Sequence, residues 1–503
     1  MKTIKLSAKY LKDAQIFYKD YCNKDNTILF ESAEIVDKSG VQSIIGFRSC
    51  LKISCEDLKV CVKALNENGR YLALALAKIY KKDLVDNTFY VSFKRPSGNL
   101  DEFSRLKSEG PLDVMRSLIT IVKPCTEIFI AGVIAFDFIN NFENIANVPK
   151  GENPCDDYCY YISDISIHIN HVKKTTSIIS YVFAEDEYKD TALAALDIKD
   201  KIDLFDKTCD LSLEYKVKPL INPDLDDEEF SKIIDSVKEH IKKSDAFQVV
   251  PSRTFIHPCK APLKAYTYLK KLNPSPYMYF IKDPKFIIFG ASPEFALRYE
   301  AFNRSISISP IAGTRARGFD ENGKIDYETD TRIELELRTD KKEVAEHLML
   351  VDLARNDLAR ISKPNSRYVS NLLHVDKYQS VMHLVSDVHA TLLDDLDAFN
   401  AYLACMNMGT LSGAPKIKAH ELIYKYEGKK RGSYGGVISL LSADGSFDSC
   451  IAIRSAFVKN DTAYVQAGCG VVFDSDTKSE CEETVNKARS VLTALSYALK
   501  EED

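Results

Sequence analysis

The order of the strands and helices that the sequence predicts is the feature that most limits how this chain can fold. Roughly the first 210 residues alternate short β-rich segments with polar turns, whereas the second half carries longer helical patterns. Strands and helices therefore come in separate runs, with few strand–helix–strand units, and this order favours an α+β fold with antiparallel sheets. The expected strands of the first half include Thr27–Phe30, Ser43–Ile53, Thr88–Phe93 and Thr176–Phe183.

A polar segment, Asp210–Asp227, is the best candidate for a linker, because it holds two prolines and ends in a run of acidic residues. It divides the chain into an N-terminal α+β lobe, residues 1–225, and a second domain, residues 226–503. We expect the two lobes to be interleaved.

The second half contains four clear helix signals and a strand pair. Apolar residues recur at helical spacing in Asp227–Lys243, which predicts an amphipathic helix. Lys341–Ile361 has no Gly or Pro, and Pro415–Tyr426 has Pro at its start and Gly428 beyond its end. Ser479 followed by Glu482 is a capping-box pattern for a last helix that ends near Lys500. The expected strand pair is Ser449–Lys459 and Thr462–Phe473.

Charge and cysteine usage exclude several classes of protein. The 503 residues include 67 basic and 73 acidic side chains, a net charge of -6, which gives no reason to expect nucleic acid or an acidic membrane as partner. The longest apolar run, Ile128–Phe136, is far shorter than the ~20 residues of a membrane span. The 13 cysteines include no C-x-x-C pair, so we expect free thiols and a cytoplasmic location.

The last helix offers a candidate cation site. Glu480, Glu483 and Lys487 cluster on the face opposite its apolar stripe. One interpretation is a solvated face with a Glu483–Lys487 pair at i,i+4. The other is a pair of carboxylates for a hard cation such as Mg²⁺. Spacing alone favours the first. Glu346 on the long helix 341–361 is a second carboxylate source, and this helix could also be a charged surface helix or part of a buried polar network that holds two lobes together.

Cationic and glycine-rich segments suggest an anion site. The loop Pro310–Gly318 combines two glycines with two arginines. Glycine lets the backbone N–H groups approach an anion, and arginine can form two parallel hydrogen bonds with a carboxylate or phosphate. Gly409–Lys416 leads into a helix N-terminus. Arg454 shares an expected strand face with small residues, and this face either lines a polar cavity or lies on an exposed edge strand. His383 lies between apolar neighbours, and a histidine in such a place is more often structural than catalytic. Together these residues suit a small dianionic substrate that the pattern does not identify.

At this point the motifs match a known family. The chain resembles the chorismate-utilising enzymes and, within them, the large subunits (component I) of anthranilate synthases. In the N-terminal half the matching residues are Leu29–Glu34. In the second half they run in order through Phe247–Arg253, Asn273–Met278, Gly290–Glu294, Pro310–Gly318, Glu346–Arg360, Val381–Ser386, Gly409–Lys416, Gly432–Gly436, Ile451–Ala456, Gln466–Asp474 and Ser479–Arg489.

The resemblance implies an α/β/β/α fold of two antiparallel sheets packed face to face, with residues 226–503 as the chorismate-binding domain. It implies an Mg²⁺-dependent lyase that converts chorismate and ammonia to anthranilate and pyruvate. Glu346 and Glu483 would hold Mg²⁺, with Glu480 nearby through water. Glu294 would protonate the leaving hydroxyl and His383 would serve the pyruvate elimination, with Thr314 and Gln248 beside them. The implied substrate-binding residues are Gly313, Thr314, Thr410, Tyr434, Arg454, Gly468, Gly470 and Lys487.

Two positions discriminate within the family. Relatives that form para-aminobenzoate through a covalent adduct carry a Lys where this chain has Ala312, and isochorismate and salicylate synthases carry a water-activating Lys where it has Gln248. An alanine cannot form the adduct and an amide cannot act as a general base, so both positions point to anthranilate. Two alternatives stay open: an aminodeoxychorismate synthase component I that aminates directly, and a catalytically silent tryptophan-sensing or partner-binding protein.

The resemblance also implies regulation and a partner. L-Tryptophan would inhibit by binding at Glu31 and Ser32, and this site would be completed by Asn273, Pro276, Tyr277 and Met278. The opposing interpretation is that both segments are only turns. Because no glutaminase pattern is visible, a separate glutamine amidotransferase subunit would supply ammonia, in a heterotetramer.

Overall fold

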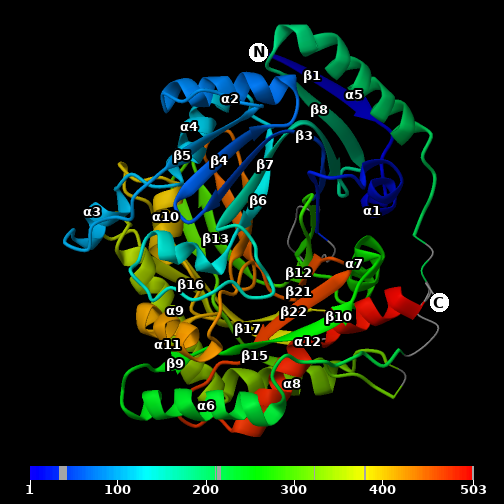
Figure 1. The fold of residues 1–503 in the computed structure, drawn as a ribbon. Helices are drawn as coiled ribbons and strands as arrows, with labels where there is room; N and C mark the ends of the chain where they lie inside the picture. The colour runs from blue at the N-terminus through cyan, green and yellow to red at the C-terminus, as the bar shows by residue number, and fades with distance from the viewer. Residues whose placement is uncertain (33–41, 210, 212–216, 322, 379–380, 501–503) are drawn as a thin grey trace.

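The computed structural model of the chain describes residues 1–32, 42–209, 211, 217–321, 323–378 and 381–500. It confirms an α+β fold built on antiparallel strands (Figure 1). The expected linker lies partly outside the described residues, and the boundary near residue 225 stays a prediction. Strands from both halves pair, since Glu31 lies opposite Met278 and Ile134 opposite Val437.

Two long strands, β3 (Gln42–Glu56) and β7 (Tyr158–Asn170), join two sheets. Their pairing is interrupted by register shifts between Gly46 and Leu51, and on either side of these bulges they pair with different neighbours. A bulge bends a strand and increases its twist, which lets one strand serve two sheets.

The first sheet runs in the order β1 (Lys2–Ala8), β8 (Thr175–Val182), β7, β3, β2 (Thr27–Glu31), β11 (Tyr277–Lys282), β12 (Ile287–Ser292), β21 (Ser455–Lys459), β22 (Thr462–Gly468) and β10 (Ser252–Pro258). The second runs β5 (Thr88–Ser92), β4 (Lys59–Ala64), β3, β7, β6 (Phe129–Ile134), β19 (Val437–Leu441), β20 (Phe447–Ile451), β13 (Phe295–Glu300), β14 (Ser305–Ile308) and β17 (Val381–Thr391), and β17 also pairs with β15 (Ile311–Ala316) and β16 (Tyr368–Lys377). A separate pair consists of β9 (Gln248–Val249) and β18 (Gly413–Ala414).

Helices cover the outer faces of both sheets. The longer ones are α2 (Glu67–Ile79), α4 (Asp113–Val122), α5 (Tyr188–Asp203), α6 (Asp227–Lys242), α7 (Pro262–Leu272), α8 (Tyr327–Thr339), α9 (Lys341–Ala359), α10 (Ala398–Cys405), α11 (Lys416–Glu427) and α12 (Thr477–Lys500). Short helical segments are α1 (Ala14–Phe17), a π-helical turn (Tyr18–Cys22), α3 (Glu102–Leu106) and 3₁₀ turns at Phe136–Asn141 and Glu185–Glu187.

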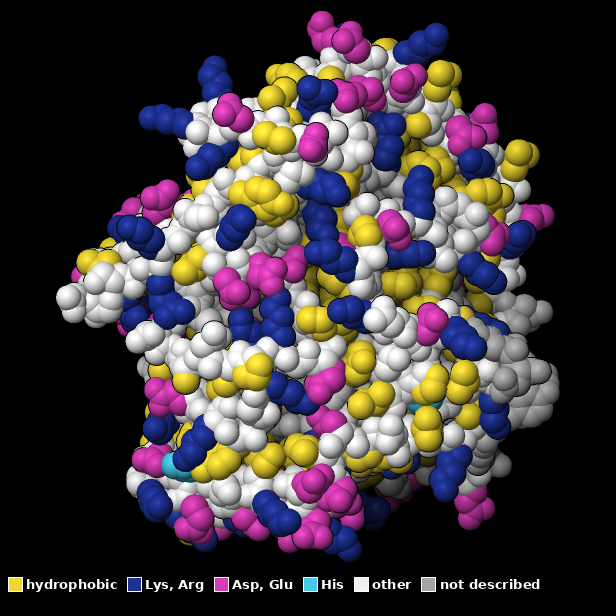
Figure 2. Space-filling model, viewed as in Figure 1, with side chains coloured by type: hydrophobic (Ala, Val, Ile, Leu, Met, Phe, Trp, Pro, Cys, Tyr) yellow, Lys and Arg dark blue, Asp and Glu magenta, His cyan; other side chains and the backbone are white. Residues whose placement is uncertain are grey.

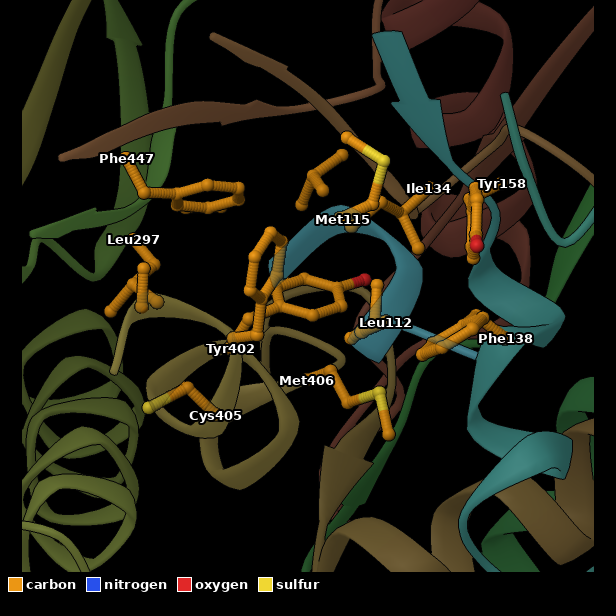
Figure 3. Close-up of a cluster of buried hydrophobic side chains, with 14 of the residues drawn as sticks. Leu112, Met115, Ile134, Phe138, Tyr158, Leu297, Tyr402, Cys405, Met406 and Phe447 are labelled. Carbon is orange, nitrogen blue, oxygen red and sulfur yellow. The ribbon is translucent and has the colours of Figure 1, made fainter. Parts of the chain in front are cut away.

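Three apolar clusters show the layers. One, which includes Ile28, Phe129 and Ile438, takes side chains from both sheets and lies between them. A second packs α5, α7 and α12 on the first sheet, and a third packs helices such as α2, α4 and α10 on the second. Figure 3 shows part of the third cluster, in which Met115 of α4 and Tyr402 of α10 lie among strand residues. The expected face-to-face arrangement with helices outside is thus confirmed.

The surface mixes charges of both signs. On the face shown in Figure 2, Lys and Arg side chains are interspersed with Asp and Glu rather than gathered into one large patch. Among the described residues no helix is long and apolar enough to cross a membrane. All 13 cysteines lie in the described part and are free, as expected.

Of the four predicted helices, three agree with α6, α9 and α11 to within two residues at each end. Three other details of the prediction are wrong. The expected strand Thr462–Phe473 ends at Gly468, as β22. The other two details concern the last helix and the strand before β22. The last helix begins at Thr477, where the carboxylate of Asp476 accepts the backbone N–H of Ser479 at 2.9 Å, so Asp476 and not Ser479 caps it. The expected strand 449–459 is interrupted at residues 452–454, because Arg454 has a φ of +49°.

Candidate functional site

Three glutamates from α9 and α12 face one another. The pKa of Glu346 is raised to about 7, mainly by burial; the nearby carboxylates of Glu343, Glu480 and Glu483 contribute to the rise, and Lys342 opposes it. Burial and Glu483 likewise raise the pKa of Glu480. Residues more than 130 positions apart in the sequence are therefore close enough to repel one another.

The chemistry of this acidic group fits a hard divalent cation. Glu480 is 6% exposed, and its Oε2 atom is buried without a hydrogen-bond partner. The cations nearby are lysines at the rim: Lys342 lies 3.7 Å from Glu346, and Lys487 lies 2.6 Å from Glu483. Among the described residues no group of three or more His, Cys, Asp and Glu side chains is arranged so that it could hold a metal ion, so the fit rests on the buried, unpartnered oxygen of Glu480 and on the carboxylates near it.

Glu294 is a buried carboxyl group with a strongly shifted pKa. It lies in the turn between β12 and β13, is 7% exposed, and accepts a hydrogen bond from the Thr410 hydroxyl at 3.2 Å. Burial raises its pKa to about 8, so the group holds a proton at neutral pH. It opens onto a small, mostly apolar pocket that is lined in part by Leu350, Leu353 and Met408.

His383 lies on β17 opposite Thr314 of β15. The Thr314 hydroxyl is 2.9 Å from Nδ1, and the Gly313 carbonyl is 3.3 Å from the same nitrogen. Burial lowers the pKa of His383 to about 4, and the positive charges of Arg454 and Lys487 also lower it. The imidazole is therefore neutral at physiological pH and able to accept a proton.

Cationic groups border this histidine. Arg454 donates to the Lys487 carbonyl at 2.6 Å, and the Lys487 ammonium donates to the Gly468 carbonyl at 3.0 Å. Arg454 is partly buried in the break between β20 and β21, so the edge-strand interpretation is wrong, and so is the expected alternating strand face. Its left-handed backbone conformation removes it from the pleat of both strands.

The remaining substrate-binding candidates form tightly packed walls. A Cβ on Gly468 would lie 2.6 Å from the Pro251 carbonyl and 3.1 Å from the Tyr434 hydroxyl, and a Cβ on Gly470 would lie 3.1 Å from the Gln248 amide nitrogen. Tyr434 and Gln248 are buried. The glycines therefore let the backbone approach these two side chains closely.

The arginine-rich segment does not form the expected anion-binding loop. Residues 311–316 are strand β15, with a bulge at Gly313, whose φ is +65°. Arg315 pairs with Asp340 and Glu343, and Arg317 forms two hydrogen bonds with the buried Asp330. Both guanidinium groups are thus occupied by carboxylates that the sequence places 13 to 28 residues away.

The proposed inhibitor residues are brought together only in part. Glu31 lies opposite Met278 in the sheet and accepts hydrogen bonds from the Tyr266 hydroxyl at 2.7 Å and the Lys270 ammonium at 2.9 Å. Ser32 follows Glu31 directly, and Asn273, the C-terminal cap of α7, lies four residues before β11 begins at Tyr277. Tyr277 instead binds Asp448 and Arg298 through its hydroxyl, on the other face of β11 from Met278. The roles of Pro276 and the other members stay predictions.

Lys342 and the apolar pocket wall were not predicted from the sequence. The i,i+4 spacing of Lys342 and Glu346 was visible in the sequence, but spacing does not show that the pair borders two further carboxylates. The pocket wall is formed by α9 together with residues 408–410, and no local sequence pattern shows that these two segments lie side by side.

Comparisons with known proteins give a consistent result. The family described as chorismate binding enzyme matches residues 80–493. Anthranilate synthase component 1 of Haemophilus influenzae is 45% identical over 97% of this chain and 95% of its own length, and that of Vibrio parahaemolyticus is 42% identical over 99% and 93%. The crystal structure of anthranilate synthase component I from Streptococcus pneumoniae superposes with a TM-score of 0.70 at 28% identity, covering 91% of this chain and 94% of that one. The menaquinone-specific isochorismate synthase of Escherichia coli, 16% identical over 98% of this chain and 94% of its own, shares the fold with a TM-score of 0.65.

Proposed function

We propose that this chain, which belongs to the family of chorismate-binding enzymes, acts as the synthase component of an anthranilate synthase. In this role it converts chorismate and ammonia to anthranilate and pyruvate, in the biosynthesis of L-tryptophan. The observation that carries the proposal is Glu294, a buried carboxyl group with a pKa of about 8 and a single hydroxyl partner, Thr410.

The amination step follows from the protonation state of Glu294. Loss of the 4-hydroxyl of chorismate requires a proton, and a carboxyl group that is still protonated at neutral pH can donate it as ammonia adds at ring carbon 2. The departing oxygen leaves as water. Gln248 cannot act as a general base for a competing water, and Ala312 cannot form a covalent adduct. Neutral ammonia therefore remains the nucleophile.

The elimination step follows from His383. Its neutral imidazole, bonded to the Thr314 hydroxyl through Nδ1, can accept the ring proton at carbon 2 while the enolpyruvyl group leaves as pyruvate. The positive charges of Arg454 and Lys487 next to it suit the enolpyruvyl carboxylate. Tyr434, Gly468 and Gly470 would complete that wall.

Glu346 and Glu483 would hold Mg²⁺, with Glu480 nearby through water. When bound, the ion would supply positive charge for the ring carboxylate of chorismate. The unpartnered Oε2 of Glu480 and the mutual repulsion of the three carboxylates support this assignment.

Further proposals concern the setting of the enzyme. Because its relatives are component 1 proteins, a second component, a glutamine amidotransferase that supplies ammonia, would complete a heterotetramer. L-Tryptophan would inhibit at Glu31 and Ser32. Free thiols throughout the chain are consistent with a cytoplasmic location.

One assay tests the activity. The purified chain is mixed with chorismate, Mg²⁺ and an ammonium salt at mildly alkaline pH, and anthranilate fluorescence and pyruvate are followed together. We expect both products in equal amounts. A 4-amino product without pyruvate would instead identify an aminodeoxychorismate synthase, and no product at all would favour a silent sensor or partner-binding protein.

A variant separates the two steps. His383→Ala should still aminate chorismate but stall before pyruvate loss, so the aminated intermediate should accumulate and be detected by mass spectrometry. Undiminished anthranilate output from this variant would remove His383 from the elimination step.

A further inference from the structure

We propose that Arg315 and Ser386 are positioning residues, which hold Glu346 at a fixed place relative to the two strands that carry Thr314 and His383. The inference rests on the proposed function, in which Glu346 holds the divalent cation. Neither residue touches the substrate in this proposal, because the hydrogen bonds described below join each of them to other parts of the chain.

The first anchor is at the start of α9. The Asp340 carboxylate caps this helix through Oδ1, which accepts the N–H groups of Lys342 at 2.9 Å and Glu343 at 3.2 Å. Its other oxygen accepts from Arg315 Nη2 at 3.3 Å, while Arg315 Nη1 donates to Glu343 Oε1 at 2.9 Å. One guanidinium group from β15 therefore holds two carboxylates of the first helical turn.

The strand and the helix are also in close contact at this point. Gly313 adopts a left-handed conformation at the bulge of β15, and a Cβ there would lie 2.9 Å from Glu343 Oε2. The Glu343 carboxylate thus lies directly over the backbone of the residue before Thr314. Arg315 also donates to the Thr314 carbonyl at 3.1 Å, which ties the same guanidinium to the strand itself.

The second anchor follows Glu346 by one residue. His347 is fully buried, and its Nε2 atom is 2.7 Å from the Ser386 hydroxyl on β17. Ser386 lies three residues after His383 on that strand, and its oxygen also accepts the Leu373 N–H from β16 at 3.0 Å. The hydroxyl therefore connects the helix of Glu346 to the strand of His383.

Glu346 lies between these two anchors, at residues 343 and 347, which span about one turn of helix. A helix held at both ends of one turn cannot rotate or slide without breaking a hydrogen bond. Groups that hold metal ligands in place are worth about 10- to 100-fold in metal affinity. We therefore expect the anchors to act on cation binding before they act on any chemical step.

The test measures Mn²⁺ binding by electron paramagnetic resonance, with no substrate present. Arg315→Gln and Ser386→Ala should each weaken binding about tenfold. Arg315→Lys keeps the positive charge but cannot bridge both carboxylates, and it should weaken binding about threefold. A purely electrostatic role predicts the opposite, because loss of a nearby positive charge in Arg315→Gln would tighten cation binding.

Arg332→Gln is the matched control, since Arg332 lies on α8 in an exposed pair with Glu336 at 3.8 Å. It should bind Mn²⁺ as the unmodified chain does. Thermal unfolding of each variant checks that it is folded, and Arg315→Lys carries the test of Arg315 if Arg315→Gln does not fold. Suppose that the unmodified chain binds Mn²⁺ and that the three variants Arg315→Lys, Arg315→Gln and Ser386→Ala all bind it as tightly as the control does. This inference is then overturned, while the proposed metal site stands. If the unmodified chain binds no Mn²⁺, the metal assignment in the proposed function fails as well.

Discussion

Glu31 and Glu294 are both buried glutamates next to antiparallel strands, one in each half of the chain, with exposures of 4% and 7%. Glu31 has an ammonium group and a phenol as hydrogen-bond donors, Lys270 and Tyr266. Glu294 has one hydroxyl donor and no cation bonded to it. Burial therefore raises the pKa of Glu294 to about 8, and it becomes an acid that can give up a proton near neutral pH.

This difference separates structural from chemical carboxylates. A buried carboxylate that pairs with a cation of its own chain ties two elements together, here β2 and α7 through Glu31 and Lys270. A buried carboxyl group without such a cation must hold a proton or bind a ligand. Glu294 and Glu480 belong to the second kind, whereas Glu346 is half-buried and lies 3.7 Å from Lys342 at the rim.

The largest effect on turnover is expected when Glu294 is replaced. Glu294→Gln should lower turnover by about 10²- to 10⁴-fold, since an amide cannot donate the required proton. Glu31→Gln should instead act mainly on stability and cost about 1–3 kcal/mol, because it removes the charge that Lys270 binds. Anthranilate fluorescence and thermal unfolding measure the two effects. An equal loss of turnover in both variants would break the distinction.

Removal of the cation comes next. Chelation with EDTA should abolish anthranilate formation, and added Mg²⁺ should restore it. Glu346→Gln should raise the Mg²⁺ concentration needed for half-maximal activity by about 10- to 100-fold, since it removes a charged ligand. Steady-state rates over a range of Mg²⁺ measure this shift. Full activity after exhaustive chelation would show that the acidic group has another role.

The pH dependence should be about tenfold in size. Because the pKa of Glu294 is raised to about 8, its proton is present below that pH and is lost as pH rises through it. The rate divided by the concentration of neutral ammonia should therefore be about tenfold lower at one pH unit above 8 than at a pH well below 8. This correction is essential, since neutral ammonia itself becomes more abundant as pH rises. A corrected rate that keeps rising past pH 8 would count against Glu294 as the acid.

The smallest effect concerns inhibition. Ser32→Ala or Glu31→Ala should raise the tryptophan concentration needed for half-inhibition by about 2- to 10-fold, the value of one hydrogen bond. Inhibition curves at fixed chorismate measure the shift. Unchanged curves for both variants would remove these residues from the inhibitor site and leave Glu31 as a structural anchor only.

Local patterns predicted the helices well because each is specified by its own residues. α6 has its apolar spacing and α11 has Pro415 at its start and Gly428 at its end, and both agree with the prediction. The strand expected at 449–459 is interrupted because the backbone turns at Arg454, whose side chain donates to the Lys487 carbonyl. That contact joins residues 33 positions apart and leaves no local signal.

The sequence by itself determined which chemical groups this protein has: acidic residues on two helices, a histidine between apolar neighbours, and amide or alanine side chains where a lysine would change the reaction. Only the tertiary structure decided which of these charged and polar groups have a partner of opposite charge or a hydrogen-bond partner within the chain. Arg315 and Arg317, which could have bound an anion, are used by Asp330, Asp340 and Glu343, whereas Glu480 keeps an oxygen without a partner. The physical reason is that the pKa and the pairing of a charged group depend on its nearest neighbours in space, and folding brings these together from distant parts of the chain.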